Sequence, residues 1–246
     1  MSTTKQFLLD LLVPSSLHLP MRYNYYKFKG YIDKEMLYVQ EHLNSNHTFL
    51  DIGANAGIYS YHFRNKMKKI VAFEPVKEVL ISLENLKSSN VKIHNCALSN
   101  NCNYLEIHIP VDKHGNKISY TASLEPRTEN TIKRKIEVKM LDDFNYQNIS
   151  LIKIDVEGHE LEVLKGGYET INKFKPHMVI EIEQRHLAYD MNKTFDYIKS
   201  VGYEIFFINN GELCPINKFS YDKHQKPYLD NVMDENYTNN FVCMPI

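Results

Sequence analysis

The chain has 246 residues, 43% of them hydrophobic, and a formal net charge of −1 at pH 7. This length fits one α/β domain with additions, and the balanced charge gives no general attraction to nucleic acid. Four cysteines show neither metal-ligand spacing nor the pattern of a disulfide framework. We therefore expect a cytoplasmic protein with reduced thiols and with neither a nucleic acid nor a membrane as partner.

Residues 1–46 are predicted to be an N-terminal extension. Its apolar run from Phe7 to Val13 is interrupted by Asp10 and is too short to span a bilayer, so it indicates a packing helix or a contact in a homo-oligomer. Aromatic residues crowd positions 20–31, and a helix is predicted from Asp33, a good N-cap, to about Leu43.

Strands and helices alternate in the next part of the chain. Apolar runs predict strands over 48–52, 70–73 and 91–94, and helical spacing predicts helices over 58–66 and 76–86. This order is typical of one half of a doubly wound parallel sheet.

An interruption follows, and then the alternation resumes. Residues 104–109 and 134–140 have the period of antiparallel strands, and the polar segment 110–133 between them is predicted to be a lid-like insertion. Further strands are predicted over 151–155, 178–182, 203–208 and 240–244, with helices over 159–165 and 193–201. We expect residues 47–246 to form an α/β domain whose seven-stranded, mostly parallel sheet has helices on both faces and an antiparallel last strand pair.

A glycine turn follows the first of these strands. Residues Asp51, Gly53, Asn55 and Gly57 have the spacing D-x-G-x-N-x-G, and Glu74 ends the next strand. Glycine allows close backbone approach, asparagine tolerates a left-handed conformation, and the following helix start can bind a negative group. A dinucleotide site requires G-x-G-x-x-G, whereas an acid ahead of the first glycine fits a ligand with an ammonium group. With Glu74 available for a ribose, the pattern favours S-adenosylmethionine (SAM) over a glycine turn that only closes a corner.

A second group of polar residues surrounds the end of the strand at 151–155. Asp155 is followed within four residues by Glu157 and His159, and Lys153 precedes it on the same strand face. Ligands of open α/β sheets bind beyond the carboxyl ends of the strands, and such clusters are more often sites than scaffolding. For Glu160 we expect only the helix-start role that the helix dipole favours.

Four segments together resemble one known family: FLDIGANAGIYS, VAFEPVKEVLISLENL, MLDDF and LIKIDVEGHELEVLKG. They are similar to the FkbM-like SAM-dependent methyltransferases, from about Phe49 to Glu183. The resemblance implies a Rossmann-like class I methyltransferase fold and O-methylation of a sugar or polyketide hydroxyl. By position it implies SAM contacts from Asp51, Gly53, Asn55, Gly57, Glu74 and Pro75, with Asn95 and Ala97 beside the adenine. We expect a nucleotide-linked sugar of bacterial surface polysaccharide synthesis as the acceptor.

Methyl transfer to a hydroxyl requires an oriented acceptor and a base. The candidates for the base are Asp155, Glu157 and His159, while Lys153 either orients a carboxylate or the acceptor, or forms a structural ion pair. We favour a mechanism without metal; the alternative is a divalent cation held by Asp155 with Glu181 or Glu183.

Three other classes stay open at this stage. They are a methyltransferase acting on RNA or protein, a nicotinamide-dependent oxidoreductase, and a non-catalytic module that binds SAM. The charge balance counts against RNA, the missing third glycine against nicotinamide, and the intact set of acids against the module.

Overall fold

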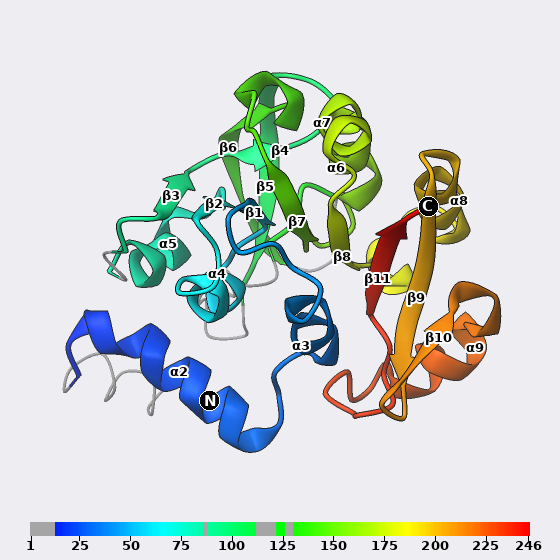
Figure 1. Ribbon diagram of the computed structural model, residues 1–246. Helices are drawn as coiled ribbons and strands as arrows, with labels where there is room; N and C mark the ends of the chain where they lie inside the picture. Colours follow the sequence, from blue (N-terminus) through cyan, green and yellow to red (C-terminus); the bar gives the residue numbers. More distant parts are fainter. Residues whose placement is uncertain (1–12, 86–87, 112–121, 126–129) are drawn as a thin grey trace.

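The computed structural model describes residues 13–85, 88–111, 122–125 and 130–246. Its main sheet has eight strands in the order β10-β9-β11-β8-β7-β1-β2-β3 (Figure 1). The five strands that run parallel to one another are β1 (Thr48–Ile52), β2 (Lys69–Phe73), β3 (Val91–His94), β7 (Ile149–Ile154) and β8 (His177–Glu181). Strand β11 (Asn240–Pro245) is antiparallel to both β8 and β9 (Tyr203–Asn209). The mostly parallel sheet with an antiparallel last pair is therefore confirmed.

The sheet has one strand more than the seven we predicted. Strand β10 (Glu212–Pro215) folds back on β9 as a hairpin through Asn210 and Gly211, both of which have positive φ. The short, polar sequence of β10 carries little strand signal, and its pairing with β9 decides its conformation.

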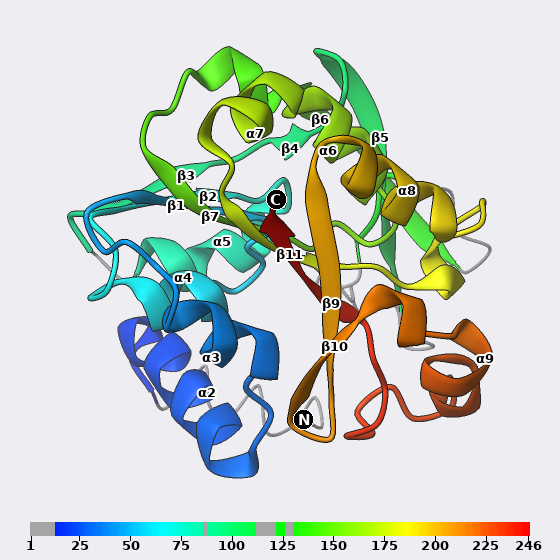
Figure 2. The same cartoon turned by 45° about the vertical axis from the view of Figure 1, so that its right-hand side comes forward.

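Two layers of helices cover the sheet, as the rotated view shows (Figure 2). Alternate residues of β1 face opposite sides: Phe49 packs with Phe63, whereas Leu50 and Ile52 pack with Val163. The helices of the first layer are α2 (Ser15–Lys29), α3 (Lys34–Gln40), α4 (Ile58–Phe63) and α5 (Lys77–Glu84). The helices of the second layer are α6 (Glu160–Gly166), α7 (Tyr168–Phe174) and α8 (Asn192–Ser200). Both faces of the parallel strands are thus buried, as their continuous apolar sequences predict.

A second, three-stranded sheet stands beside the first. Strands β5 (Asn103–Pro110) and β6 (Thr131–Lys139) pair antiparallel, and the short β4 (Ala97–Leu98) runs parallel to β6. The antiparallel pair is confirmed. Because these strands extend to 110 and begin at 131, the predicted insertion is shorter than 110–133, and its residues 112–121 and 126–129 lie outside the described residues.

Helix α2 and helix α7 are absent from the elements that we predicted. Pro20 lies inside α2, and its aromatic residues obscure the helical period of the sequence. Most of the apolar run 7–13 lies outside the described residues. Within the part of the chain that the structure describes, no helix is both long and apolar enough to cross a bilayer.

Polar side chains interrupt the apolar surface at one edge of the sheet, near the carboxyl ends of β1, β7 and β8 and at the start of the antiparallel β11. Asp51 is in register with Lys153 across β1 and β7, and Glu181 with Asn240 across β8 and β11. Each of these four residues is two positions away from a residue of the core under α3 and α4, so all four side chains lie on the same face of the sheet. The strand register therefore assembles a polar row from four separate parts of the sequence.

Candidate active site

A cavity lies at the carboxyl edge of the sheet, between the two sheets. The space inside it, part of which is open to solvent, is about 430 Å³. Its lining comes from the ends of β1, β2 and β7, from the segment before β5, from β5 itself and from the segment 122–125. The lining residues are Ile52, Gly53, Phe73, Glu74, Pro75, Cys96, Ala97, Leu98, Ile107, Ala122, Leu124, Asp155 and Val156.

The glycine turn has the conformations that its sequence predicts. Gly53, Asn55 and Gly57 have φ values of +76°, +48° and +88°. A Cβ on Gly53 would lie 1.7 Å from the carbonyl oxygen of Asp155, and one on Gly57 would lie 2.5 Å from Leu83. Glycine is therefore required at both positions by conformation and by space. Gly53 brings the ends of β1 and β7 into direct contact.

Asp51 has a different position from the one we expected. Its Oδ2 accepts hydrogen bonds from the Ser60 N–H (3.0 Å) and from the Ser60 hydroxyl (2.6 Å), and only 2% of the residue is exposed. It is not among the cavity-lining residues. Burial raises the pKa of Asp51 to about 6, against the opposing effect of the Ser60 hydrogen bonds. In the structure Asp51 anchors α4 to the end of β1, and its predicted role toward an ammonium group is without geometric support.

Glu74 lines the cavity and holds the turn at the same time. Its Oε2 accepts from the N–H of Asn55 (2.9 Å) and its Oε1 from the N–H of Val76 (2.8 Å). Burial raises the pKa of Glu74 to about 7, and the two backbone hydrogen bonds oppose that rise. Each carboxylate oxygen can accept a second hydrogen bond. Two acceptor positions thus remain available for ribose hydroxyls.

The residues that we expected beside the adenine also gather here. Pro75 and Ala97 line the cavity, together with Cys96 and Leu98. Asn95 contributes from outside: its amide donates to the carbonyl oxygens of Glu74 (2.9 Å) and Pro75 (3.0 Å). These side chains give the cavity an apolar wall, which Asn95 fixes to the end of β2.

On the opposite wall, Asp155 is the carboxylate that faces the cavity. Its side chain is 35% exposed, and its Oδ2 lies 3.9 Å from Lys153 Nζ. Burial raises the pKa of Asp155, and the nearby Lys153 ammonium opposes the rise. Burial contributes more to this rise than the charges of the neighbouring acids do.

Lys153 is buried, with 3% of its side chain exposed, and it lies between two carboxylates. Its ammonium donates to Asn240 Oδ1 (2.7 Å) and lies 3.9 Å from both Asp155 Oδ2 and Glu181 Oε2. Burial lowers the pKa of Lys153, but the carboxylates outweigh this and leave its pKa above the ordinary value. For Glu181, burial and the charge of Asp155 raise the pKa well above its usual range. Burial thus disfavours the ionised form of Glu181, whereas the neighbouring carboxylates favour the charged form of Lys153.

This arrangement bears on the metal alternative. The Lys153 ammonium already lies between Asp155 and Glu181, the pair that would ligate a divalent cation. Among the described residues, no group of three or more His, Cys, Asp or Glu side chains is placed to hold a metal ion. A cation bound by this pair would have to displace a charged lysine.

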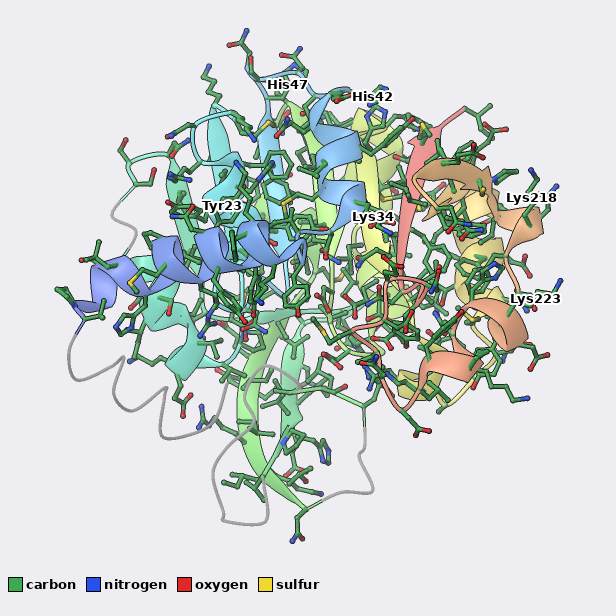
Figure 3. The ribbon with its side chains drawn as sticks, turned by 90° about the horizontal axis from the view of Figure 1, so that it is seen from below. Tyr23, Lys34, His42, His47, Lys218 and Lys223 are labelled. Atoms are coloured by element: carbon green, nitrogen blue, oxygen red, sulfur yellow. The ribbon has the colours of Figure 1, made fainter. Side chains whose placement is uncertain are left out.

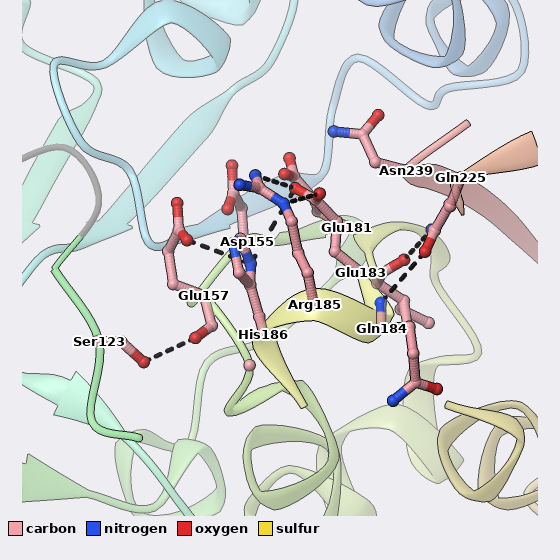
Figure 4. A network of polar contacts seen from close by, with 12 residues as sticks. Ser123, Asp155, Glu157, Glu181, Glu183, Gln184, Arg185, His186, Gln225 and Asn239 are labelled. Atoms are coloured by element: carbon pink, nitrogen blue, oxygen red, sulfur yellow. Dashed lines mark hydrogen bonds and ion pairs between the residues drawn. The ribbon is translucent and has the colours of Figure 1, made fainter. Parts of the chain in front are cut away.

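Glu157 lies beside Asp155 and turns toward the loop that follows β8 (Figure 4). Its φ is +57°, a strained value for a residue with a side chain, and its Oε2 lies 3.2 Å from His186 Nδ1. Its carbonyl oxygen accepts from the Ser123 hydroxyl (2.6 Å). At Gly158 a Cβ would lie 2.5 Å from the His186 carbonyl oxygen. The acidic turn is thus closely packed between the 122–125 segment and the β8 loop.

His159 does not line the cavity. Its Nε2 pairs with the Ser99 hydroxyl (2.8 Å) and its Nδ1 with Glu125 Oε1 (2.8 Å), and the residue is 8% exposed. Glu160 Oε1 accepts from the N–H of Gly158 (2.9 Å), and burial raises the pKa of Glu160 to about 7. Both residues hold the turn in shape. The geometry therefore favours Asp155 over His159 as the base.

A charged network beyond the turn was missed by sequence reasoning, apart from Glu183 (Figure 4). Arg185 donates to both oxygens of Glu183, from Nε at 2.5 Å and from a terminal nitrogen at 3.0 Å, and the Tyr237 hydroxyl also donates to Glu183. Burial on its own would raise the pKa of Glu183, but these bonds outweigh it and hold the pKa at about 2. The signal in the sequence was the charged run E-I-E-Q-R-H at the end of β8.

The comparisons with known proteins agree with this geometry. Residues 51–205, more than half of the chain, match the family model described as the Methyltransferase FkbM domain. Methyltransferase sdnD from Sordaria araneosa is 31% identical in an alignment of 175 residues, and the match covers 56% of this chain and 67% of that protein. Methyltransferase 1 from Beauveria bassiana (strain ARSEF 2860) is 28% identical over 141 residues, covering 48% of this chain and 57% of that protein.

A solved structure shows the same fold. The crystal structure of Methyltransferase FkbM from Methylobacillus flagellatus KT matches with a TM-score of 0.52 and 20% sequence identity. The match covers 82% of this chain but 44% of that chain, so this protein spans less than half the length of that relative. The mostly parallel sheet, its strand order and the family match together show that this chain has the Rossmann-like class I methyltransferase fold and belongs to the FkbM methyltransferase family.

Proposed function

We propose that this protein transfers a methyl group from SAM to a hydroxyl oxygen of a sugar, with Asp155 as the base. One observation carries the proposal: a single cavity is bordered by the glycine turn with Glu74 on one side and by the Asp155 carboxylate on the other. A donor bound at the turn and an acceptor beside Asp155 would therefore share the same space.

The donor side fits the chemistry of SAM. Gly53 leaves room that any side chain would fill, and Glu74 has acceptor positions for ribose hydroxyls. Pro75, Ala97 and Leu98 offer an apolar surface for an adenine. When bound, SAM supplies a methyl group that is electrophilic because it is attached to a sulfonium. The protein's own contribution is then to hold an acceptor oxygen in line and to remove its proton.

Asp155 is suited to take that proton. Its raised pKa makes it a stronger base than an ordinary carboxylate, and the Lys153 ammonium favours its ionised form. The Glu181 side chain hydrogen-bonds with Asp155 and helps to fix its orientation. Activity should therefore rise with pH as Asp155 loses its proton.

The acceptor side is rich in carboxylates, which favours a neutral polyhydroxyl compound. Carboxylate oxygens accept hydrogen bonds from sugar hydroxyls, whereas phosphates placed beside Asp155 and Glu157, those of RNA and those of a nucleotide-linked sugar alike, would be repelled. The sugar itself, its nucleotide linkage and a role in bacterial surface polysaccharide synthesis rest on the family resemblance.

Two measurements test the proposal. Calorimetry with SAM should show binding, and incubation with SAM and a panel of free and nucleotide-linked sugars should yield S-adenosylhomocysteine and a product one methyl group heavier. The same panel in the presence of a strong chelator tests the metal alternative, and we expect turnover to persist. If calorimetry detects no binding of SAM, or if only RNA or a protein is methylated, the proposal is wrong.

A further inference from the structure

Helix α2 carries an apolar stripe on its outer surface. Leu17, Met21, Tyr25 and Phe28 are 48%, 43%, 44% and 86% exposed. At about 100° per residue they fall within about 80° of arc. The opposite side of the helix, with Leu19, packs on α4 and α5. The stripe is therefore a coherent surface and not a set of scattered side chains.

Cations flank this stripe on both sides. The sequence of α2, from Ser15 to Lys29, contains no acidic residue, and it places Lys27 on one flank and Arg22 and Lys29 on the other. Two more cations, Arg64 and Lys66, follow the end of the neighbouring helix α4, and Lys27 and Arg64 are close enough to Lys66 to lower its pKa. The outer surface of α2 is thus apolar in its centre with cations at its margins.

We propose that α2 docks on an anionic lipid surface, with its apolar stripe among the acyl chains and its cations at the headgroups. A helix with an apolar face bordered by lysine and arginine is the form that lies in a bilayer interface. Phe28 and Tyr25 are aromatic, and aromatic side chains are common at the interface between headgroups and acyl chains. This departs from our expectation that the protein has no membrane partner.

A second copy of the chain is the competing occupant, and the charges disfavour it. In a symmetric dimer through α2, Arg22, Lys27 and Lys29 of one copy would approach those of the other, with no acidic residue in either helix to pair with them. An anionic lipid surface offers charges of the opposite sign to the same three side chains.

The docking surface lies at the same end of the molecule as the cavity. Leu19 of α2 packs in one cluster with Ala54, which belongs to the glycine turn at the carboxyl end of β1. Figure 3, seen from below, shows α2 running across this end of the fold. A lipid surface bound by α2 would therefore lie at the end of the molecule that carries the cavity.

Vesicle flotation with the full chain tests the docking without reference to methyl transfer. The protein should float with vesicles of equal parts phosphatidylcholine and phosphatidylglycerol, bind phosphatidylcholine alone much more weakly, and detach as salt is added. Phe28→Ser should lower the partition coefficient about tenfold. Lys27→Gln and Lys29→Gln should each lower it about fivefold.

Matched controls separate docking from folding. Tyr168 on α7 is 44% exposed, as is Tyr25, so Tyr25→Ser should weaken flotation while Tyr168→Ser leaves it unchanged. Lys218→Gln and Lys223→Gln, labelled in Figure 3, alter exposed cations outside α2 and should also have no effect. All variants should keep the melting temperature of the parent.

Three results would overturn the proposal. They are a parent protein that binds neither kind of vesicle, a Phe28→Ser variant that floats as well as the parent, and a parent dimer that Phe28→Ser converts to monomers. The last result would show that a second copy covers the stripe.

Discussion

The two walls of the cavity are built from different interactions. On the donor wall, the glycine turn is held by backbone geometry: three residues with positive φ, and backbone N–H groups that donate to Glu74. On the acceptor wall, Asp155 lies 3.9 Å from the buried Lys153 ammonium behind it, which lies at the same distance from Glu181 on the neighbouring strand β8. The donor wall is therefore a rigid and local structure, whereas the acceptor wall depends on long-range electrostatics and on protonation. A change on one wall should affect binding and a change on the other should affect the rate.

Gly53→Ala should have the largest effect of any single change. The new Cβ would lie 1.7 Å from the Asp155 carbonyl oxygen, so the ends of β1 and β7 would have to separate. We expect a loss of more than about 4 kcal/mol in the free energy of unfolding, measured with urea, and no detectable SAM binding.

Gly211→Ala is the matched control for this change. Gly211 has a similar φ of +81°, but a Cβ there would have nothing within 4 Å. It should cost only about 1–2 kcal/mol, the price of the left-handed conformation. Equal losses in the two variants would show that conformation, and not the close approach of two strands, makes glycine necessary at position 53.

Asp155→Asn should separate catalysis from binding. The amide cannot take a proton, so kcat should fall about 100-fold or more, while the Kd for SAM by calorimetry stays close to that of the parent. A variant with unchanged kcat would remove Asp155 from the mechanism and return Glu157 to consideration.

Glu74→Gln should give the reverse pattern on the donor wall. Glutamine has one acceptor oxygen in place of two, so it would lose one of the bonds from Asn55 and Val76 and set an NH₂ group against a backbone N–H. The Kd for SAM should rise about tenfold, with a smaller change in kcat. If this variant and Asp155→Asn alter Kd and kcat alike, the division between the two walls fails.

Arg185→Met should destabilise the acceptor side through Glu183. It leaves a buried carboxylate without its cation, and we expect a loss of about 2 kcal/mol, less than for a fully buried pair because the Arg185 side chain is 39% exposed. The folded pKa of Glu183, about 2, lies below its ordinary value of 4.5, so its contribution is complete above 4.5 and is lost as pH falls toward 2. The deficit of the variant should accordingly shrink over that range in urea unfolding.

Arg134→Met provides the comparison for this prediction. Arg134 also binds both oxygens of one glutamate, Glu78, but the two side chains are 33% and 43% exposed. Its loss should cost less than about 1 kcal/mol. A cost as large as that of Arg185→Met would mean that burial is not what makes the Glu183 pair important.

Glu160→Gln should have the smallest effect, seen in the dependence of stability on pH. The folded pKa of Glu160, about 7, lies above its ordinary value of 4.5, so the folded state holds the extra proton between these values. The free energy of unfolding should therefore decrease as pH rises through this window. Removing the titrating group should flatten this decrease, and identical pH profiles would contradict the raised pKa.

Much of the fold could be predicted because its signals are local. The strand at 91–94 was predicted with its observed bounds, and β1 likewise, since each is an apolar run between polar turns. The turn at Gly53, Asn55 and Gly57 could be predicted because only a few residue types readily adopt positive φ. Helix α2 was missed because Pro20 and its aromatic residues mask the helical period.

The site was predicted only in part, because local signals do not say which side chains meet in the fold. The sequence pointed to Asp155 and Glu74, and both line the cavity. It also pointed to Asp51 and His159, whose side chains are instead occupied by Ser60 and by Ser99 with Glu125. Residue type and spacing place a side chain at a strand end, but they do not say which partner it reaches.

By itself the sequence determined the order of strands and helices, the glycine turn and the acids at the strand ends, because these follow from local conformational preference and from apolar periodicity. Only the tertiary structure decided which acids face the cavity, that Lys153 lies between Asp155 and Glu181, and that Arg185 neutralises Glu183. These pairings join side chains across strand register and between loops. Their pKa values depend on burial and on the distance between charges, neither of which a linear pattern contains.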